Sequence, residues 1–600
     1  MLNSPDFNIW SQSASSGRWS SKTEFLLSSW DFKSSLNGFI SFVENSGLAL
    51  SDVTYDGFAE EFLKRHLDQI TSLKSAQDNP NEKLGAQDVE TSLRLSGFRR
   101  WKSQTGDQLR DVGRLAHIDH GANFSVPGAG KTNCLLAIHS ILKAKQTDLK
   151  LLIVCPRNAL ISWDDEAQEC LGESTNIVRL QGGKSAIKKH LDSGPQIVAI
   201  TYQQLRLSLD PVMHFMRTNS VHLVLDESHR IKGGLNSQQG RAAIALAPYA
   251  YRRDIMSGTP MPQGVSDIVS QFDFLWPGLG LGAQVEQKNE PEAKLEAAKS
   301  AIFPLYVRTT KAELGLPDPI FHYEPVTMYQ DQRELYSLLK NEAARYAVGI
   351  LDLDRRQLQM LGRQVMRLLQ FTSDPSLISK KLPREYEGGE VEQRLSVINQ
   401  KPTAKLDKLD SLVFEIMSQP GSKVVIWSMF VGVVEGLAER YKHHGTTFIH
   451  GGVPTGSDDD SEFRESRIKE FNGSPECRIL VANPAACGEG ISLHKAAHNA
   501  IYFDRSYNAA HFLQSVDRIH RRGLPDGVET NVYVLSTRNS IEDSVRDRIS
   551  LKVRALERLL DDKGLAAMVF DPDDVEEMMP DSGYLETSDI SSIRKHLSDD

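Results

Sequence analysis

Cysteine is scarce in this sequence, and long apolar runs are missing. The chain has 600 residues and only five cysteines, none in a spacing that pairs metal ligands. We expect all of them to be small buried apolar residues of a reducing compartment: Cys134, Cys155, Cys170, Cys477 and Cys487. No apolar run reaches the roughly 18 residues of a membrane span, so no membrane association is predicted. The start, MLNSPDFNIWSQS, lacks the basic and apolar segments of a secretory signal, which predicts a cytoplasmic location.

An excess of positive charge is also lacking, since the formal net charge is −10 at pH 7. The deficit comes from the end of the chain: residues 561–600 carry 12 acidic and 3 basic residues, against 67 and 66 elsewhere. The body is therefore nearly neutral and can still present a basic channel to nucleic acid. We expect the acidic tail, residues 563–600, to be disordered or a docking arm rather than a folded unit.

The length exceeds what a single hydrophobic core supports, so several domains are expected. Short apolar runs such as LLIVCP, QIVAITY and HLVLDE, and later KVVIWS, RILVANP and VYVLST, alternate with amphipathic stretches. This alternation predicts an α/β fold with parallel sheets that carry helices on both faces. The expected parts are a helical N-terminal accessory region at 1–90, a first α/β lobe at 91–310, a helical insertion at 311–400 that lacks strands from about 325 onward, a second lobe at 401–562 and the tail.

The segment FSVPGAGKT is rich in small residues and lies between a predicted strand and a predicted helix. A phosphate-binding loop needs glycines so that backbone N–H groups can close on oxygens, a lysine for the β- and γ-phosphates, and a hydroxyl for Mg²⁺. The residues that meet these needs are Gly128, Ala129, Gly130, Lys131 and Thr132. The strict pattern begins with glycine where this chain has Ser125, and GKT alone also occurs by chance.

A second motif, VHLVLDESH, runs an apolar strand directly into Asp226 and Glu227. In a parallel sheet this is where an acidic motif faces a phosphate loop. Asp226 would hold Mg²⁺, and Glu227 would orient and polarise the attacking water. The alternative is an exposed acidic pair that caps a strand. Further along, the hydroxyls of Ser257 and Thr259 in MSGTP lie on a predicted tight turn where they could sense the γ-phosphate.

In the other half of the chain, FLQSVDRIHRRG places Gln514, Arg518 and Arg521 at helical spacings of i, i+4 and i+7, which predicts one shared face. Arginines on such a stripe are usually solvated or ion-paired. With a phosphate loop in the first lobe, Arg518 and Arg521 would instead reach the γ-phosphate, and Gln514 would lie beside the nucleotide. An arginine finger accelerates phosphoryl transfer about 10³- to 10⁵-fold. ATP would then close the two lobes and hydrolysis would reopen them.

Taken in order, these motifs resemble those of the Swi/Snf family of superfamily two helicase-like DNA translocases, over about Leu95 to Leu560. The resemblance includes SVPGAGKT, LLIVCPRNALISWDDE, IVAITYQQL, LVLDESHRIKGG, IMSGTPMPQGVSDIVSQFDFLWPG and QSVDRIHRRG. DESHRIK and the ending FLWPG favour this family over helicases that unwind RNA. The resemblance implies two RecA-like lobes, ATP and Mg²⁺ as cofactors, and tracking along double-stranded DNA without obligatory strand separation.

The resemblance also assigns residues beyond the motifs above. Gln108 in QLRDVGRL would read adenine, Gly488 and Gly490 match a glycine motif near ATP, and His229 would relay nucleotide state to the DNA loops. Departures from the family pattern are Ala485 and Cys487, in place of an arginine and a glycine, and Leu524, in place of a glutamine. These departures bear on regulation and subfamily, and they leave the ATPase core intact.

DNA-facing residues are expected on loops that follow strands, where such motors contact the phosphate backbone. They are Arg157, Thr201, Tyr202, Ser428 and Asn483, each of which could equally be a capping or turn residue. Trp163 and Trp427 lie in apolar surroundings, so core packing is favoured over base stacking.

The predicted function is a DNA-stimulated ATPase that translocates on duplex DNA and remodels what is bound to it. Short stand-alone members of this kind resemble bacterial proteins, which suggests a role in phage defence or repair with a separate nuclease, because no nuclease motif is visible. One alternative is a helicase that separates strands. Another is a nucleotide-gated scaffold that binds DNA and a partner without turnover, although the intact catalytic residues argue against it.

Overall fold

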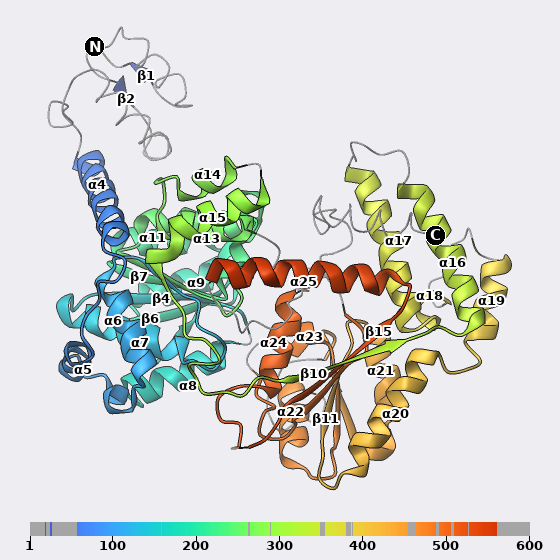
Figure 1. The fold of residues 1–600 in the computed structure, drawn as a ribbon. Coiled ribbons are helices and arrows are strands. Elements are labelled where there is room, and N and C mark those ends of the chain that lie inside the picture. The colour runs from blue at the N-terminus through green and yellow to red at the C-terminus, as the bar shows by residue number, and fades with distance from the viewer. Residues whose placement is uncertain are drawn as a thin grey trace. The chain divides into compact units, whose positions relative to one another are not determined.

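The computed structural model describes the larger part of the chain as two compact units (Figure 1). The described residues are 18–19, 25–26, 57–157, 159–261, 265–288, 290–347, 355–379, 386, 388–453, 463–487, 491–505, 509–525 and 527–560. The first unit comprises residues 1–125, 130–260 and 265–309, and the second comprises 126–129, 261–264 and 310–600. The acidic tail predicted at 563–600 lies outside the described residues.

The first unit contains a seven-stranded sheet in the order β5-β6-β4-β7-β8-β3-β9, in which every neighbouring pair is parallel. Its strands are β3 (Gly121–Asn123), β4 (Lys150–Cys155), β5 (Val178–Arg179), β6 (Ile197–Thr201), β7 (Val221–Asp226), β8 (Arg252–Met256) and β9 (Tyr306–Val307). Every residue of the central strand β7 is buried. This explains why its sequence, VHLVLD, is mostly apolar rather than alternating between apolar and polar residues.

Helices separate these strands along the chain, as parallel pairing requires. They are α6 (Gly106–His117), α7 (Lys131–Lys145), α8 (Ala159–Leu171), α9 (Gly183–Asp192), α10 (Tyr202–Leu207), α11 (Leu209–Thr218), α12 (Gln238–Leu246), α13 (Ser266–Leu275), α14 (Leu281–Glu286) and α15 (Pro291–Ile302). Ahead of them lie α4 (Gly57–Asp78), α5 (Ala86–Leu95) and a short antiparallel pair, β1 (Arg18–Trp19) with β2 (Phe25–Leu26).

The second unit contains a six-stranded parallel sheet in the order β10-β15-β14-β11-β13-β12. Its strands are β10 (Ile320–Val326), β11 (Val424–Trp427), β12 (Thr446–Ile449), β13 (Ile479–Ala482), β14 (Asn499–Tyr502) and β15 (Asn531–Thr537). Its helices are α16 (Gln330–Ala347), α17 (Arg355–Ser373), α18 (Ser376–Ser379), α19 (Glu390–Ile398), α20 (Ala404–Ser418), α21 (Val431–Arg440), α22 (Arg464–Gly473), α23 (Pro484–Cys487), α24 (Ala509–Ile519) and α25 (Ile541–Leu560).

One strand corrects the expected organisation. β10 falls inside the stretch 311–400 that the sequence predicts as a helical insertion, yet it pairs in parallel with β15 along its whole length. It is an edge strand, and all of its residues except Val326 are exposed or half-buried. An edge strand needs no continuous apolar run and tolerates a proline, here Pro325, so the pattern IFHYEPV gave no strand signal.

The α/β class with two parallel sheets is confirmed. All five cysteines lie in the described part of the chain, where they are buried and form no disulfide, as expected. Trp163 and Trp427 are 1% and 0% exposed, which confirms that they pack in the core. Among the described helices, not one combines the length and the apolar character needed to cross a membrane.

Candidate active site

The site residues of the first unit lie at the carboxyl edge of its sheet. The phosphate loop follows β3, the acidic pair ends β7, and the SGTP turn follows β8, and these three strands are neighbours in the order β7-β8-β3. Parallel strands all end at the same edge, which is where open α/β sheets bind their ligands. The structure therefore gathers on one edge three motifs that are far apart in the sequence.

The phosphate loop depends on the backbone freedom of glycine. Gly128 and Gly130 have φ angles of 89° and 83°, in the left-handed region that side chains other than glycine rarely adopt. Gly130 precedes the first residue of α7, Lys131, whose Nζ donates to the Ser125 carbonyl at 2.9 Å. Thr132 lies in the first turn of α7, where unpaired helix N–H groups favour an anion.

Ser125, which replaces the first glycine of the strict pattern, has a defined role. Its side chain is fully buried, and its hydroxyl donates to Asp111 Oδ2 at 3.1 Å and accepts the Thr309 N–H at 2.9 Å. Thr309 Oγ1 also donates to Asp111 Oδ2, at 2.8 Å. The start of the phosphate loop is thus bonded to α6 and to the segment after β9. Sequence reasoning missed Asp111 and Thr309, because in QLRDVGRL it assigned a role to Gln108 alone and Thr309 carried no chemical signal.

Gln108 lies on the first turn of α6, and its side chain is directed at the phosphate loop. Its Oε1 accepts the Thr105 N–H at 3.1 Å, which completes a capping box with the Thr105 hydroxyl. Its Nε2 is so close to Gly130 that a Cβ atom there would overlap it. The cap therefore fixes Gln108 beside the loop, while its contact with adenine remains a prediction.

The two acidic residues are held by different neighbours. Asp226 is 8% exposed, and its Oδ2 accepts the indole N–H of Trp163 at 2.9 Å. Glu227 has a φ of 50°, and its Oε2 lies 3.4 Å from both His229 Nδ1 and Ser257 Oγ. Burial opposes a charge on Glu227, but the hydrogen bond from His229 and the charges of His229 and Lys131 outweigh it and lower the pKa of Glu227. Glu227 is therefore ionised at neutral pH.

The SGTP turn is bonded to the acidic motif. His229 Nδ1 lies 3.1 Å from Ser257 Oγ, and the same hydroxyl accepts the Thr259 N–H at 3.1 Å. Ser257 N–H also donates to the Asn123 carbonyl of β3 at 3.2 Å. The hydroxyl-bearing residues of the turn are almost fully buried. His229 thus connects Glu227 to the turn, while its relay of nucleotide state to the DNA loops remains a prediction.

In the second unit, Gln514 and Arg518 lie on α24 and are buried. Arg518 Nε donates to the Gln514 carbonyl, and its Nη1 donates to the Ile491 carbonyl, both at 3.0 Å. The prediction that Arg521 shares their helical face is wrong, because α24 ends at Ile519 and Arg521 lies beyond it. Arg521 Nη1 donates to Ser492 Oγ at 2.9 Å.

The hydrogen bonds of Gln514, Arg518 and Arg521 do not test the other nucleotide-binding predictions made for the second unit. Gly488 and Gly490 lie outside the described residues. The reach of Arg518 and Arg521 toward a triphosphate in the first unit remains a prediction.

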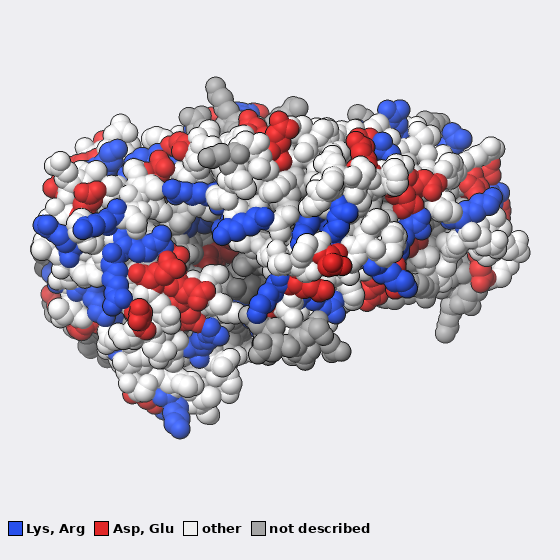
Figure 2. All heavy atoms as spheres, turned by 90° about the horizontal axis from the view of Figure 1, so that it is seen from below, with Lys and Arg blue, Asp and Glu red and all other residues white. Residues whose placement is uncertain are grey.

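The residues predicted to face DNA all lie at or just after the ends of strands, but their side chains differ. Arg157, after β4, is exposed. Thr201 caps α10 by accepting the Gln204 N–H at 3.2 Å. Asn483 Nδ2 donates to the Met429 carbonyl at 2.8 Å. On the face shown in Figure 2, Lys and Arg lie among Asp and Glu, so charge alone marks no DNA path there.

The other two residues predicted to face DNA require a correction. Tyr202 is 2% exposed, and its hydroxyl donates to the Asp226 carbonyl at 2.7 Å. Ser428 is fully buried, and its hydroxyl donates to Asp504 Oδ2 at 2.6 Å. A buried hydroxyl with a partner inside the fold cannot present itself to a phosphate, so both residues position their loops instead.

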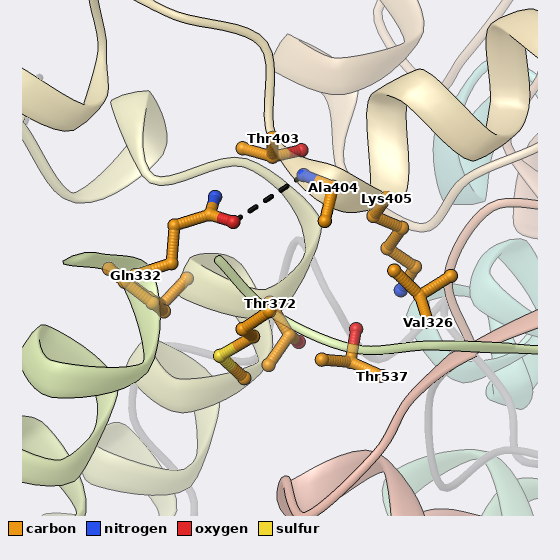
Figure 3. Close-up of a pocket in the computed structure, with 9 residues that line it drawn as sticks. Val326, Gln332, Thr372, Thr403, Ala404, Lys405 and Thr537 are labelled. Carbon is orange, nitrogen blue, oxygen red and sulfur yellow. Dashed lines mark hydrogen bonds between the residues drawn. The ribbon is translucent and has the colours of Figure 1, made fainter. Parts of the chain in front are cut away.

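A small cavity in the second unit lies away from these residues (Figure 3). Its volume is about 10 Å³, which is room for a single water molecule. Its lining residues are Val326, Met328, Gln332, Phe371, Thr372, Thr403, Ala404, Lys405 and Thr537. The Ala404 N–H donates to Gln332 Oε1 at 3.4 Å, and Lys405 Nζ pairs with Glu542 Oε1 at 2.5 Å. The cavity is therefore a packing feature and too small for a nucleotide.

Two family models match the chain. The model of the SNF2-related domain matches residues 125–377, and that of the helicase conserved C-terminal domain matches residues 404–523. The two matches together cover more than half of the chain. The chain belongs to the SNF2 family.

Known SNF2 relatives are similar over most of this chain. The ATP-dependent helicase fft1 of Schizosaccharomyces pombe is 25% identical over 71% of this chain and 49% of its own length. The DNA repair and recombination protein RAD54 of Saccharomyces cerevisiae is 24% identical over 75% of this chain and 54% of its own length. The ISWI chromatin-remodeling complex ATPase ISW2 of the same yeast is 26% identical over 73% of this chain and 38% of its own length. The chain thus spans about half or less of the length of these relatives.

Among solved structures, the SWI2/SNF2 ATPase core of Sulfolobus solfataricus in complex with dsDNA is 20% identical to this chain. The match covers 83% of this chain and 97% of that one, with a TM-score of 0.34.

Membership of the SNF2 family implies the use of ATP, and the residues present fit a nucleotide with its metal. The carboxylate of Asp226 and the hydroxyl of Thr132 are oxygen ligands of the type that Mg²⁺ prefers. The left-handed Gly130 lacks the Cβ that would overlap Gln108, so the loop backbone can close against that side chain. Lys131, Thr132, Asp226 and Glu227 are therefore the residues that would hold and process ATP in this SNF2 chain.

Proposed function

We propose that the chain is a double-stranded DNA translocase that hydrolyses ATP with Mg²⁺ and remodels DNA–protein complexes. The observation that carries this proposal is the convergence of the phosphate loop, the acidic pair and the SGTP turn at one sheet edge. The hydrogen bonds among Glu227, His229 and Ser257 add to it, because a non-catalytic scaffold has no need to hold a water-orienting carboxylate in place.

Each residue of the first unit has a distinct task in this proposal. The N-terminus of α7 and Lys131 bind the β- and γ-phosphates. Thr132 and Asp226 would hold Mg²⁺, which neutralises phosphate charge when it is bound. Glu227, kept ionised by His229 and Lys131, orients a water and accepts its proton. Arg518 and Arg521 would contribute positive charge at the γ-phosphate.

Duplex DNA as the substrate is supported by the names of the SNF2 relatives, which include a DNA repair and recombination protein and a chromatin-remodelling ATPase. On this chain the exposed Arg157 is the residue best placed to contact a backbone phosphate. Affinity for DNA should then fall steeply with salt, because phosphate contacts release counterions. Phage defence, a separate nuclease partner, a bacterial origin and a cytoplasmic location remain proposals drawn from the sequence.

The test is an ATPase assay with and without duplex DNA, on the wild type beside Lys131→Ala and Glu227→Gln. We expect DNA to stimulate the wild type and both variants to be inactive. No stimulation would favour the nucleotide-gated scaffold. Displacement of a triplex-forming strand without duplex unwinding would support translocation, whereas separation of a fluorescent duplex would favour a strand-separating helicase.

A further inference from the structure

Asp226, the residue assigned to the metal, is bonded at both its side chain and its backbone by aromatic residues from two other elements. The indole N–H of Trp163 donates to Oδ2 at 2.9 Å, and the phenol of Tyr202 donates to the carbonyl at 2.7 Å. Trp163 and Tyr202 are 1% and 2% exposed, so water does not compete for either bond. Hydrogen bonds to a charged group in such surroundings are stronger than those between neutral groups.

These two bonds fix different degrees of freedom. A donor on one carboxylate oxygen sets the plane of the Asp226 side chain and therefore the direction in which its lone pairs point. A donor on the carbonyl holds the backbone at the end of β7, just before the left-handed residue Glu227. Partners of this kind around a metal ligand typically alter metal affinity or activity.

Trp163 and Tyr202 also lie close in the chain to the loops that are predicted to contact DNA. Trp163 lies on α8, the helix that follows β4 and the exposed Arg157. Tyr202 is the first residue of α10 and directly follows Thr201, the last residue of β6. Each donor therefore belongs to a helix that begins at one of the loops predicted to contact DNA. A shift of either loop changes a bond to Asp226 within the same unit.

We propose that Trp163 and Tyr202 are positioning residues that orient Asp226 toward the metal and transmit DNA contact at the loops after β4 and β6 to that carboxylate. The inference rests on the proposed function, because it requires a metal-bound nucleotide and a DNA-contacting face. It is separate from the contacts of His229, which reach Glu227 and the SGTP turn.

The test replaces each donor by phenylalanine. Trp163→Phe and Tyr202→Phe remove the N–H and the O–H while keeping an aromatic ring. Trp276→Phe is the matched control for the indole: Trp276 is fully buried in the same unit, and its Nε1 has no hydrogen-bond partner among the described residues. It loses the same volume without losing a bond to the site.

Two quantities are measured on the full chain. The first is the Mg²⁺ concentration that half-saturates binding of a fluorescent ATP analogue, which needs no turnover. We expect Trp163→Phe to raise it roughly 10- to 100-fold and Tyr202→Phe to raise it by less. We expect Trp276→Phe to leave it unchanged. The second is the ratio of ATPase rates with and without duplex DNA, which should fall in both donor variants and stay at the wild-type value in Trp276→Phe.

The outcomes separate this inference from the proposed function. An unchanged Mg²⁺ midpoint in Trp163→Phe, or an equal shift in Trp276→Phe, overturns the positioning role. A shifted midpoint with an unaltered DNA ratio overturns the transmission role. If the wild type itself shows no DNA stimulation, the proposed function fails, and the Mg²⁺ titration still decides whether the two aromatic residues orient Asp226.

Discussion

Replacing Gly130 by alanine tests the geometry of the phosphate loop. Gly130 has a φ of 83°, and the left-handed conformation costs a residue with a side chain about 1–2 kcal/mol. A Cβ atom would also lie well inside 3.0 Å of Gln108 Nε2. Gln108 cannot easily move away, because it is 7% exposed and its Oε1 is bonded to the Thr105 N–H. Overpacking of this kind adds about 1–3 kcal/mol, so we expect Gly130→Ala to lower the free energy of unfolding by about 2–5 kcal/mol.

The control separates strain from overlap. Gly194 in the same unit has a φ of 71°, and a Cβ atom there would meet no atom within 4 Å. Gly194→Ala should therefore cost only the strain of about 1–2 kcal/mol. Adding Gln108→Ala to Gly130→Ala removes the overlapping atom and should restore part of the loss. Urea unfolding followed by circular dichroism measures the free energies, and binding of a fluorescent nucleotide reports on the loop. Equal losses in Gly130→Ala and Gly194→Ala would refute the close approach of Gln108 to the loop.

Three further predictions follow from the site and the core. Glu227→Gln should reduce turnover about 10²- to 10⁴-fold with little change in nucleotide binding, and a comparable loss of binding would contradict its role as a base. Its control, Glu439→Gln, alters a side chain that is 71% exposed and should change neither quantity. Asp504 is buried, which raises its pKa to about 6, so ionisation in the folded state costs stability. Asp504→Asn should stabilise the protein by up to about 3 kcal/mol at pH 7.5 and by less at pH 5, where the folded aspartate is largely protonated. Burial lowers the pKa of His139 well below 6.5, so the unfolded chain binds more protons below that pH. The free energy of unfolding should then fall as the pH drops below 6.5, and His139 should contribute at most about 1.4 kcal/mol per pH unit to this fall. In urea unfolding measured at several pH values, His139→Asn should make the free energy of unfolding depend less steeply on pH.

The parts of the site that the sequence predicted are those in which chemistry directly follows an apolar strand. A short, mostly apolar run such as VHLVL is typical of a strand buried on both faces, which predicted Asp226 and Glu227 at its carboxyl end. The phosphate loop carries its own signal, because its glycines are required by positive φ angles. Local patterns of this kind depend on neighbours in the chain and are therefore visible without coordinates.

The remainder of the site depends on residues that meet only in three dimensions. Trp163 and Asp226 are 63 positions apart, and the indole gave only a packing signal. Asp111 lies 198 positions from Thr309, so their bond to each other and their bonds to Ser125 gave no signal in the sequence. Helix ends are similarly weak signals, which is why Arg521 was assigned to a helix that ends before it.

The left-handed conformation of Glu227 explains how two consecutive carboxylates can serve different networks. In a regular strand, neighbouring side chains point to opposite faces of the sheet, and one of them would be lost to the site. A φ of 50° breaks this alternation directly after β7. Asp226 thereby bonds to Trp163, while Glu227 bonds to His229 and Ser257 of the neighbouring turn. Such a conformation costs a residue with a side chain about 1–2 kcal/mol, and it persists where the surrounding bonds over-determine it. Because the strain separates the carboxylate proposed to bind the metal from the one proposed to orient water, each can respond to a different part of the protein.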